Sequence, residues 1–154
     1  MTSNIWINYI MSDIPEFMGT FSINNIPSPK SFPCYMIVNF STLNSPGSHF
    51  VTIMFLSNID CLYFDPLNLT FIPEHIINYM HKNTENIFKI NYTIQNPLSV
   101  FCGFYCLLPI MLHVNKLSII NGISVFYNSS IKNDDICVKM LTKLFKLYYL
   151  ENLY

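Results

Sequence analysis

Cysteine, histidine and aspartate are the residue types of nucleophilic acyl-transfer chemistry, and this chain carries one of each where they can serve it. The segment 95–106, Q-N-P-L-S-V-F-C-G-F-Y-C, predicts that Cys102 begins a buried helix after a proline-containing loop. The unpaired N–H groups and the dipole at a helix N-terminus favour a thiolate, which is the nucleophilic form of cysteine. Cys102 is therefore the candidate nucleophile.

A reactive cysteine also needs a base, and His49 is the best-placed histidine. It precedes the apolar run F-V-T-I-M-F-L, which a short polar turn separates from C-L-Y-F-D-P at 61–66. If these two segments form an antiparallel hairpin, Asp65 returns to the end of the hairpin that holds His49. We expect His49 to act as the base and Asp65 to orient its imidazole and stabilise the imidazolium.

Gln95 can supply the remaining requirement of acyl transfer. Negative charge builds on the carbonyl oxygen during the reaction, and hydrogen-bond donors must be aimed at it. The side-chain amide of Gln95 and the backbone N–H of Cys102 are the predicted donors.

The hydrophobic pattern predicts the elements that must position these residues. Helices are expected ahead of Pro15, from Pro73 to about Lys82, from Cys102 to about Val114, and from Asn133 onward. Strands are expected at 34–40, 49–56, 61–66 and 87–94, joined by loops at 22–33 and 41–48. Residues 49–56 are apolar on both faces, which is typical of a central strand. Pro109 should kink the third helix because it lacks an N–H. These elements predict one α+β domain over 1–154, with a mainly antiparallel or mixed sheet flanked by helices.

Composition excludes several classes of protein. Hydrophobic residues make up 51% of the 154 residues, which excludes intrinsic disorder. The net charge of -1 provides no field that would attract nucleic acid or an anionic membrane. Five irregularly spaced cysteines argue against a disulfide framework and predict a reducing, intracellular compartment. The apolar run 100–112 is too short to cross a membrane.

No cofactor or metal ion is expected. Cys102 and Cys106 lack partners at the usual spacing of metal ligands. Cys106 is interpreted as a small hydrophobic core residue. The remaining histidines, at 75, 81 and 113, are interpreted as residues of helix surfaces or of the core.

Three motifs resemble the adenovirus-type maturation proteases, the adenain-like cysteine peptidases. They are G-x-H at 47–49, Y-F-D-P at 63–66 and Q-x-P-x-S-x-x-C-G-x-x-C at 95–106, and the resemblance extends over about 17–114. It implies a sheet flanked by helices, with the nucleophile at the N-terminus of a buried helix. By this resemblance Cys102 is the nucleophile, His49 the base, Asp65 the orienting carboxylate and Gln95 the oxyanion donor.

The resemblance also implies partners and a location. The substrates would be viral precursor proteins of the capsid or core, cut at Gly-containing motifs, in the virion or in the host nucleus or a cytoplasmic virus factory. A disulfide-linked peptide activator lacks its cysteine here, because none lies between Leu62 and Phe101. Eight lysines without any arginine make poor basic surface for DNA activation. Phe50 stands where the family commonly has tryptophan.

Two other functions are compatible with the sequence. One is a peptidase of the same structural superfamily that removes ubiquitin-like modifiers. The seven-residue spacing from Gln95 to Cys102 favours the maturation protease over it. The other is an inactive homologue retained as a virion structural or interaction protein, an alternative motivated by Pro109 and by the short chain.

Overall fold

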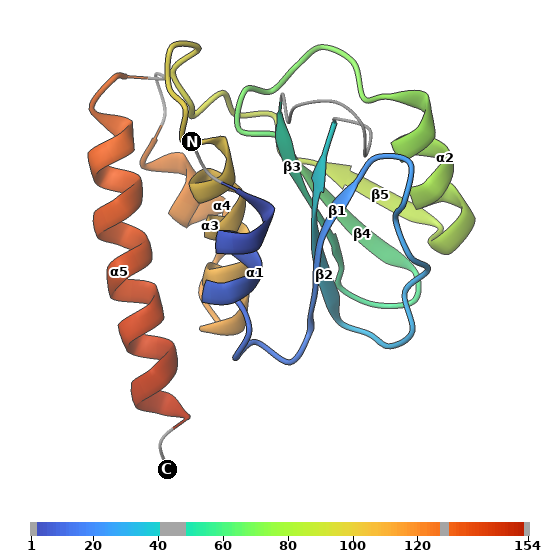
Figure 1. Cartoon of the computed structure of the whole chain (residues 1–154), viewed down its shortest axis with the longest axis horizontal. Coiled ribbons are helices and arrows are strands. Elements are labelled where there is room, and N and C mark those ends of the chain that lie inside the picture. Colours follow the sequence, from blue (N-terminus) through green and yellow to red (C-terminus); the bar gives the residue numbers. More distant parts are fainter. Residues whose placement is uncertain (1–2, 41–48, 127–129, 153–154) are drawn as a thin grey trace.

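The computed structural model describes residues 3–40, 49–126 and 130–152, which form five helices and five strands (Figure 1). The helices are α1 (Asn4–Ile10), α2 (Glu74–Asn83), α3 (Cys102–Val114), α4 (Ile119–Ser124) and α5 (Asn133–Glu151). The strands are β1 (Phe17–Ser22), β2 (Cys34–Asn39), β3 (Phe50–Phe55), β4 (Asp60–Phe64) and β5 (Asn86–Lys89).

The strands form one sheet in the order β1-β2-β3-β4-β5. β3 is antiparallel to both of its neighbours, whereas the outer pairs, β1 with β2 and β4 with β5, are parallel. The sheet is therefore mixed, as the α+β prediction allowed. Every residue of β2 and β3 is buried, which confirms the prediction that β3 is a central strand.

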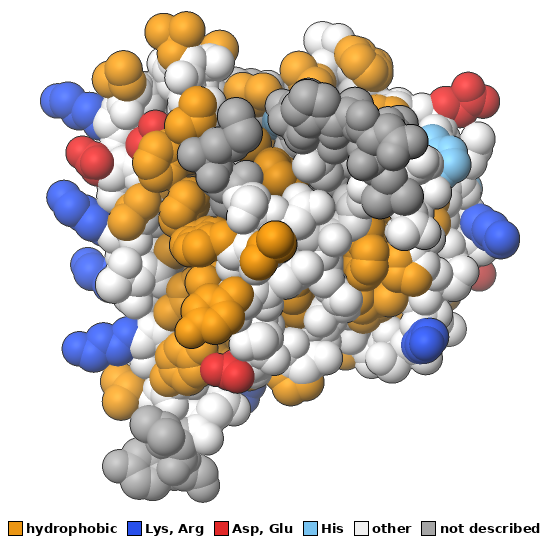
Figure 2. All heavy atoms as spheres, in the orientation of Figure 1, with side chains coloured by type: hydrophobic (Ala, Val, Ile, Leu, Met, Phe, Trp, Pro, Cys, Tyr) orange, Lys and Arg blue, Asp and Glu red, His pale blue; other side chains and the backbone are white. Residues whose placement is uncertain are grey.

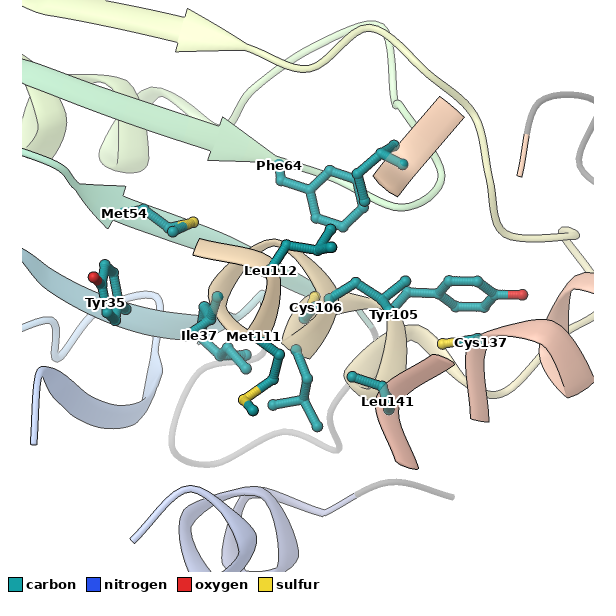
Figure 3. Close-up of a cluster of buried hydrophobic side chains, with 14 of the residues drawn as sticks. Tyr35, Ile37, Met54, Phe64, Tyr105, Cys106, Met111, Leu112, Cys137 and Leu141 are labelled. Carbon is teal, nitrogen blue, oxygen red and sulfur yellow. The ribbon is translucent and has the colours of Figure 1, made fainter. Parts of the chain in front are cut away.

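Helices cover both faces of the sheet (Figure 1). Residues of α1, α3 and α5 share a core with one face, and α2 packs with a second core on the other face. α3 is buried because its residues are apolar around the whole axis, and every residue from 105 to 112 is inaccessible or nearly so. Figure 3 shows this core, in which Ile37 of the sheet lies beside Cys106 and Met111 of α3 and Met54 belongs to the same cluster.

The C-terminal helix α5 lies on the outside, as its pattern predicts. Its apolar residues Cys137, Leu141 and Leu144 are buried against α3. Lysines alternate with them along the sequence, and Figure 2 shows lysine side chains along the outer edge of the molecule. None of the described helices is both long enough and apolar enough to cross a membrane.

Three local features differ from the sequence-based expectation. β5 ends at Lys89, so the second half of the strand expected at 87–94 does not belong to the sheet. Beyond Ile90 the chain leaves the sheet, and the N–H groups of Ile94 and Gln95 donate to the Pro66 carbonyl instead. The strand β1 and the short helix α4 were not predicted. The expected loop at 41–48 lies outside the described residues.

Candidate active site

The β3–β4 hairpin positions His49 and Asp65. His49 directly precedes β3, and Asp65 directly follows β4. The antiparallel register pairs Thr52 with Phe64, so Asp65 lies across from residue 51, two positions from His49. The hairpin predicted from the sequence therefore brings these two residues to one end of the sheet.

The carboxylate of Asp65 is fixed by its own turn. Asp65 is fully buried, and its two carboxylate oxygens accept hydrogen bonds from the backbone N–H groups of Leu67 (2.9 Å) and Leu69 (3.1 Å). Asn68 takes a left-handed conformation (φ 49°), which asparagine tolerates better than most residues, and its N–H donates to the Asp65 carbonyl. The turn therefore presents the carboxylate in a single orientation.

His49 contacts Asp65 through a short hydrogen bond. Nε2 of His49 lies 2.7 Å from Oδ1 of Asp65, and His49 is only 6% exposed. Burial on its own lowers the pKa of His49, but the hydrogen bonds and charges of Asp65 and Cys102 outweigh it and raise the pKa to about 9. The imidazolium is therefore the main form of His49 at neutral pH.

Cys102 is the first residue of α3, and its thiol lies near enough to the same imidazole to help raise the pKa of His49. Because Nε2 of His49 faces Asp65, Nδ1 is the ring nitrogen left for the thiol. Cys102 is half-buried, whereas the other four cysteines are buried. Its backbone N–H is one of the donors that the first turn of an α-helix leaves unpaired. The structure thus brings Cys102, His49 and Asp65 together in a row.

A hydrogen bond between β3 and α3 holds the N-terminal part of α3, which begins at Cys102, against the sheet. The hydroxyl of Thr52 donates to the Cys106 carbonyl at 2.7 Å, in a part of α3 that Pro109 deprives of one backbone donor. Thr52 is three residues after His49, and Cys106 is one turn after Cys102. Pro109, which was predicted to weaken this helix, lies inside a continuous α3. The hydrogen bond from Thr52 joins the helix to the sheet three residues before this proline.

Gln95 lies near the site and is almost fully buried (2% exposed). Its backbone N–H donates to the carbonyl of Pro66, the residue after Asp65. Its side-chain Nε2 donates to the Ser99 carbonyl at 2.9 Å. This bond fixes the orientation of the amide, because Oε1 in the same place would face another acceptor. Nε2 carries two hydrogens, so one N–H remains for a further acceptor.

The aromatic ring of Phe40 packs against the imidazole. The ring of Phe40 packs edge-on against His49, with centroids 5.1 Å apart, and the Phe40 N–H donates to the His49 carbonyl. Phe50 begins β3 and is 5% exposed. The Phe40 ring excludes water from part of the His49 surroundings, which strengthens the hydrogen bond from His49 to Asp65. Gly47 of the predicted motif lies outside the described residues.

The other cysteines and histidines do not join this cluster. All five cysteines are free thiols, and burial raises the pKa of Cys34 to about 11 and of Cys61 to about 12, and also raises the pKa of Cys106 and of Cys137. His113 contacts the ring of Tyr35, and burial lowers its pKa. Within residues 3–40, 49–126 and 130–152, no group of three or more such side chains is arranged to hold a metal ion.

Sequence reasoning missed the residues that hold the segment leading to Cys102. Asn133 and Asp134, the first two residues of α5, both hydrogen-bond to this segment. Nothing in the sequence distinguishes them from ordinary polar residues of a first helical turn, where acidic side chains are common. Their partners are about 35 residues away in the chain, so only the packing of α5 reveals them.

Comparisons with known proteins show a likeness of fold. No family model and no curated protein matches the chain. A crystal structure of the ASFV pS273R protease aligns with a TM-score of 0.51 and 18% identity, over 79% of this chain and 60% of that one. A Se-Met crystal structure of the same protease aligns with a TM-score of 0.46 and 21% identity, over 60% and 39%. The chain thus spans 39–60% of these proteins and shares its α+β fold with the ASFV pS273R protease.

Proposed function

We propose that this chain is a cysteine endopeptidase that cleaves viral precursor proteins during virion maturation, with Cys102, His49, Asp65 and Gln95 as its catalytic residues. The observation that carries the proposal is the placement of His49, which is hydrogen-bonded to Asp65 at 2.7 Å and lies near enough to Cys102 for the thiol to raise the pKa of its imidazole. A thiol, an imidazole and a carboxylate in this order are what acyl transfer to cysteine requires. The fold shared with the ASFV pS273R protease supports it.

The proposed mechanism gives each residue a step. The Cys102 thiolate attacks the carbonyl carbon of the scissile bond, and the carbonyl π electrons move onto its oxygen. The His49 imidazolium then donates its Nδ1 proton to the leaving amine, and a thioester remains on Cys102. Neutral His49 next takes a proton from water, whose oxygen attacks the thioester and releases the carboxylic acid. Asp65 accepts the Nε2–H bond throughout and keeps Nδ1 directed at the reacting atoms.

Gln95 and the first turn of α3 serve the oxyanion. The backbone N–H of Cys102 is unpaired within the helix, and Gln95 has one amide N–H beyond the one donated to Ser99. A single preorganised donor of this kind contributes roughly 10²–10³ to the rate. Because Gln95 is buried and fixed, its donor needs little reorganisation during the reaction.

The proposed substrates are capsid or core precursors cut at Gly-containing sites, in the virion or the infected cell. These finer assignments rest on the resemblance of the segments 63–66 and 95–106 to the adenovirus-type maturation proteases.

Peptide cleavage tests the proposal. We expect the purified protein to hydrolyse members of a panel of Gly-containing peptides, and Cys102→Ala to lower kcat by more than about 10⁴-fold. Cys106→Ala removes the same chemical group one turn further along and should retain activity, which makes it the matched control. Fusion proteins that contain a ubiquitin-like modifier are tested in parallel, because their cleavage would identify the alternative, a peptidase that removes such modifiers. Equal turnover by wild type and Cys102→Ala would show that the chain is not a cysteine peptidase.

A further inference from the structure

We propose that Asp134, on the helix α5, is a positioning residue that aligns the nucleophile and the oxyanion donor; this inference rests on the proposed function. Oδ1 of Asp134 accepts two hydrogen bonds, from the Ser99 hydroxyl at 2.8 Å and from the Tyr105 hydroxyl at 2.8 Å. Ser99 precedes Cys102 by three residues and Tyr105 follows it by three. One carboxylate oxygen therefore joins the two sides of the nucleophile.

The bond to Ser99 reaches the start of α3. The Ser99 hydroxyl donates to Asp134 and accepts from the backbone N–H of Phe101 at 3.1 Å. Phe101 is the N-cap residue of α3, directly before Cys102. Because the hydroxyl proton is directed to Asp134, the Ser99 oxygen is oriented to receive the Phe101 N–H. Without the carboxylate, this hydroxyl is free to rotate, and the peptide that enters α3 is held less firmly.

The same serine also reaches Gln95. Its carbonyl accepts the Nε2–H of the Gln95 side chain at 2.9 Å. Ser99 thus connects, through its two oxygens, the cap of α3 and the amide proposed to bind the oxyanion. Displacement of Ser99 would alter both parts of the site together.

Tyr105 gives the second attachment. It is fully buried in α3, and Figure 3 shows its side chain extending from α3 toward α5. Burial, and then the hydrogen bond from Tyr105 to Asp134, raise the pKa of Tyr105. A buried phenol needs an acceptor for its proton, and Asp134 provides one. The first turn of α3 is therefore held from α5, and the next turn is held from the sheet.

Asn133 fixes the other end of the same segment. Its side-chain amide donates to the Ile94 carbonyl at 2.9 Å and to the Phe126 carbonyl at 3.1 Å, and it is 4% exposed. Segment 94–101 is consequently held at Ile94 by Asn133 and at Ser99 by Asp134. The first turn of α5 therefore holds in place the segment that contains Gln95 and leads to Cys102.

The test compares Asp134→Ala with Asp135→Ala. Both remove one acidic side chain from the first turn of α5, but Asp135 is exposed, so the pair separates positioning from the general effect of charge on the helix. We expect Asp134→Ala to lower kcat about 10- to 100-fold with KM within about threefold of wild type, because misplacement of reacting groups affects the chemical step. Asp135→Ala should match wild type in both constants.

A second pair keeps the test decisive if Asp134→Ala is poorly folded. Ser99→Ala removes the connecting hydroxyl from a half-buried site, and Ser99→Thr retains it. We expect Ser99→Ala to lower kcat in the same way and Ser99→Thr to restore at least half of it. Equal kcat in folded Asp134→Ala and Asp135→Ala, or equal losses in Ser99→Ala and Ser99→Thr, would overturn the inference.

Alkylation of Cys102 by iodoacetamide separates this inference from the proposed function. The reaction needs the thiolate and its alignment with His49 but no peptide substrate. We expect alkylation in Asp134→Ala to be about 10-fold slower than in Asp135→Ala. Equal rates overturn the positioning role even if peptides are cleaved. A slower rate in a protein that cleaves no peptide supports the positioning role and counts against the peptidase alone.

Discussion

Two successive turns of α3 place the same side chain in opposite situations. Cys102 in the first turn is half-buried and lies near enough to His49 to help raise the pKa of its imidazole. Cys106 in the next turn is fully buried among apolar side chains, and this burial raises the pKa of its thiol well above the ordinary value. The carbonyl of Cys106 accepts a hydrogen bond from the Thr52 hydroxyl.

The comparison shows that the environment, and not the residue type, decides which thiol can react. A thiolate needs a charged or hydrogen-bonding partner and access to solvent, and the first turn of α3 provides both. The second turn provides no access to solvent, since it faces the sheet across a packed core (Figure 3). Cys106 instead contributes to stability by filling space beneath the site. The same helix therefore separates a reactive position from a structural one by a single turn.

The largest expected difference between the two turns is in the rate of thiol modification. With stoichiometric iodoacetamide under native conditions, Cys102 should react more than about 10³-fold faster than Cys106, because Cys106 becomes accessible only when the fold opens. Mass spectrometry of the modified peptides measures both rates. The preference for Cys102 should be lost in His49→Ala. Comparable labelling of Cys102 and Cys106 in the folded protein would remove the distinction.

The next largest effect is the pH dependence of the free energy of unfolding, which arises from His49 beside the first turn of α3. Its pKa is raised from 6.5 to about 9 in the folded protein, so the folded state binds more protons than the unfolded state between these values. The stabilisation is complete below pH 6.5 and is lost as the pH rises through 9. We expect the free energy of unfolding to fall by about 3 kcal/mol over this range, at 1.36 kcal/mol per pKa unit.

Urea unfolding at several pH values measures this loss. Asp65→Asn removes the carboxylate that most strongly favours the imidazolium, so its stability should depend much less on pH over the same range. Cys106→Ala should keep the slope of the wild type, because it leaves His49 and its partners in place. A slope shared by wild type and Asp65→Asn would mean that another group causes the dependence.

The smallest expected effect is the loss of stability when Cys106, in the second turn of α3, is replaced by alanine. Cys106→Ala leaves a small cavity in a packed core and should lower the free energy of unfolding by about 1–2 kcal/mol. Cys102→Ala, at the half-buried first turn, should lower it by less than about 0.5 kcal/mol. Thermal or urea unfolding of the two variants at one pH measures the pair. A larger loss in Cys102→Ala would reverse the assignment of reactive and structural turns.

Much of the site could be predicted from the sequence because its signals are local. The apolar run after His49 and the return to Asp65 define a hairpin, and a hairpin of known loop length fixes which residues share an end. The uninterrupted apolar residues of α3 likewise define a buried helix that begins near Cys102. The end of β5 was less predictable, because Ile90 and Ile94 are buried in the α3-side core without belonging to the sheet.

The amino-acid order alone determined the hairpin that joins His49 to Asp65, the buried helix that begins at Cys102 and the lysine-lined helix outside it. Periodicity and turn residues encode such features within a few neighbours. Only the tertiary structure decided that α5 holds the segment before Cys102 through Asp134, and that Gln95 donates to Ser99. These contacts depend on how separate elements pack, and no local pattern records the orientation of a side chain toward a residue far along the chain.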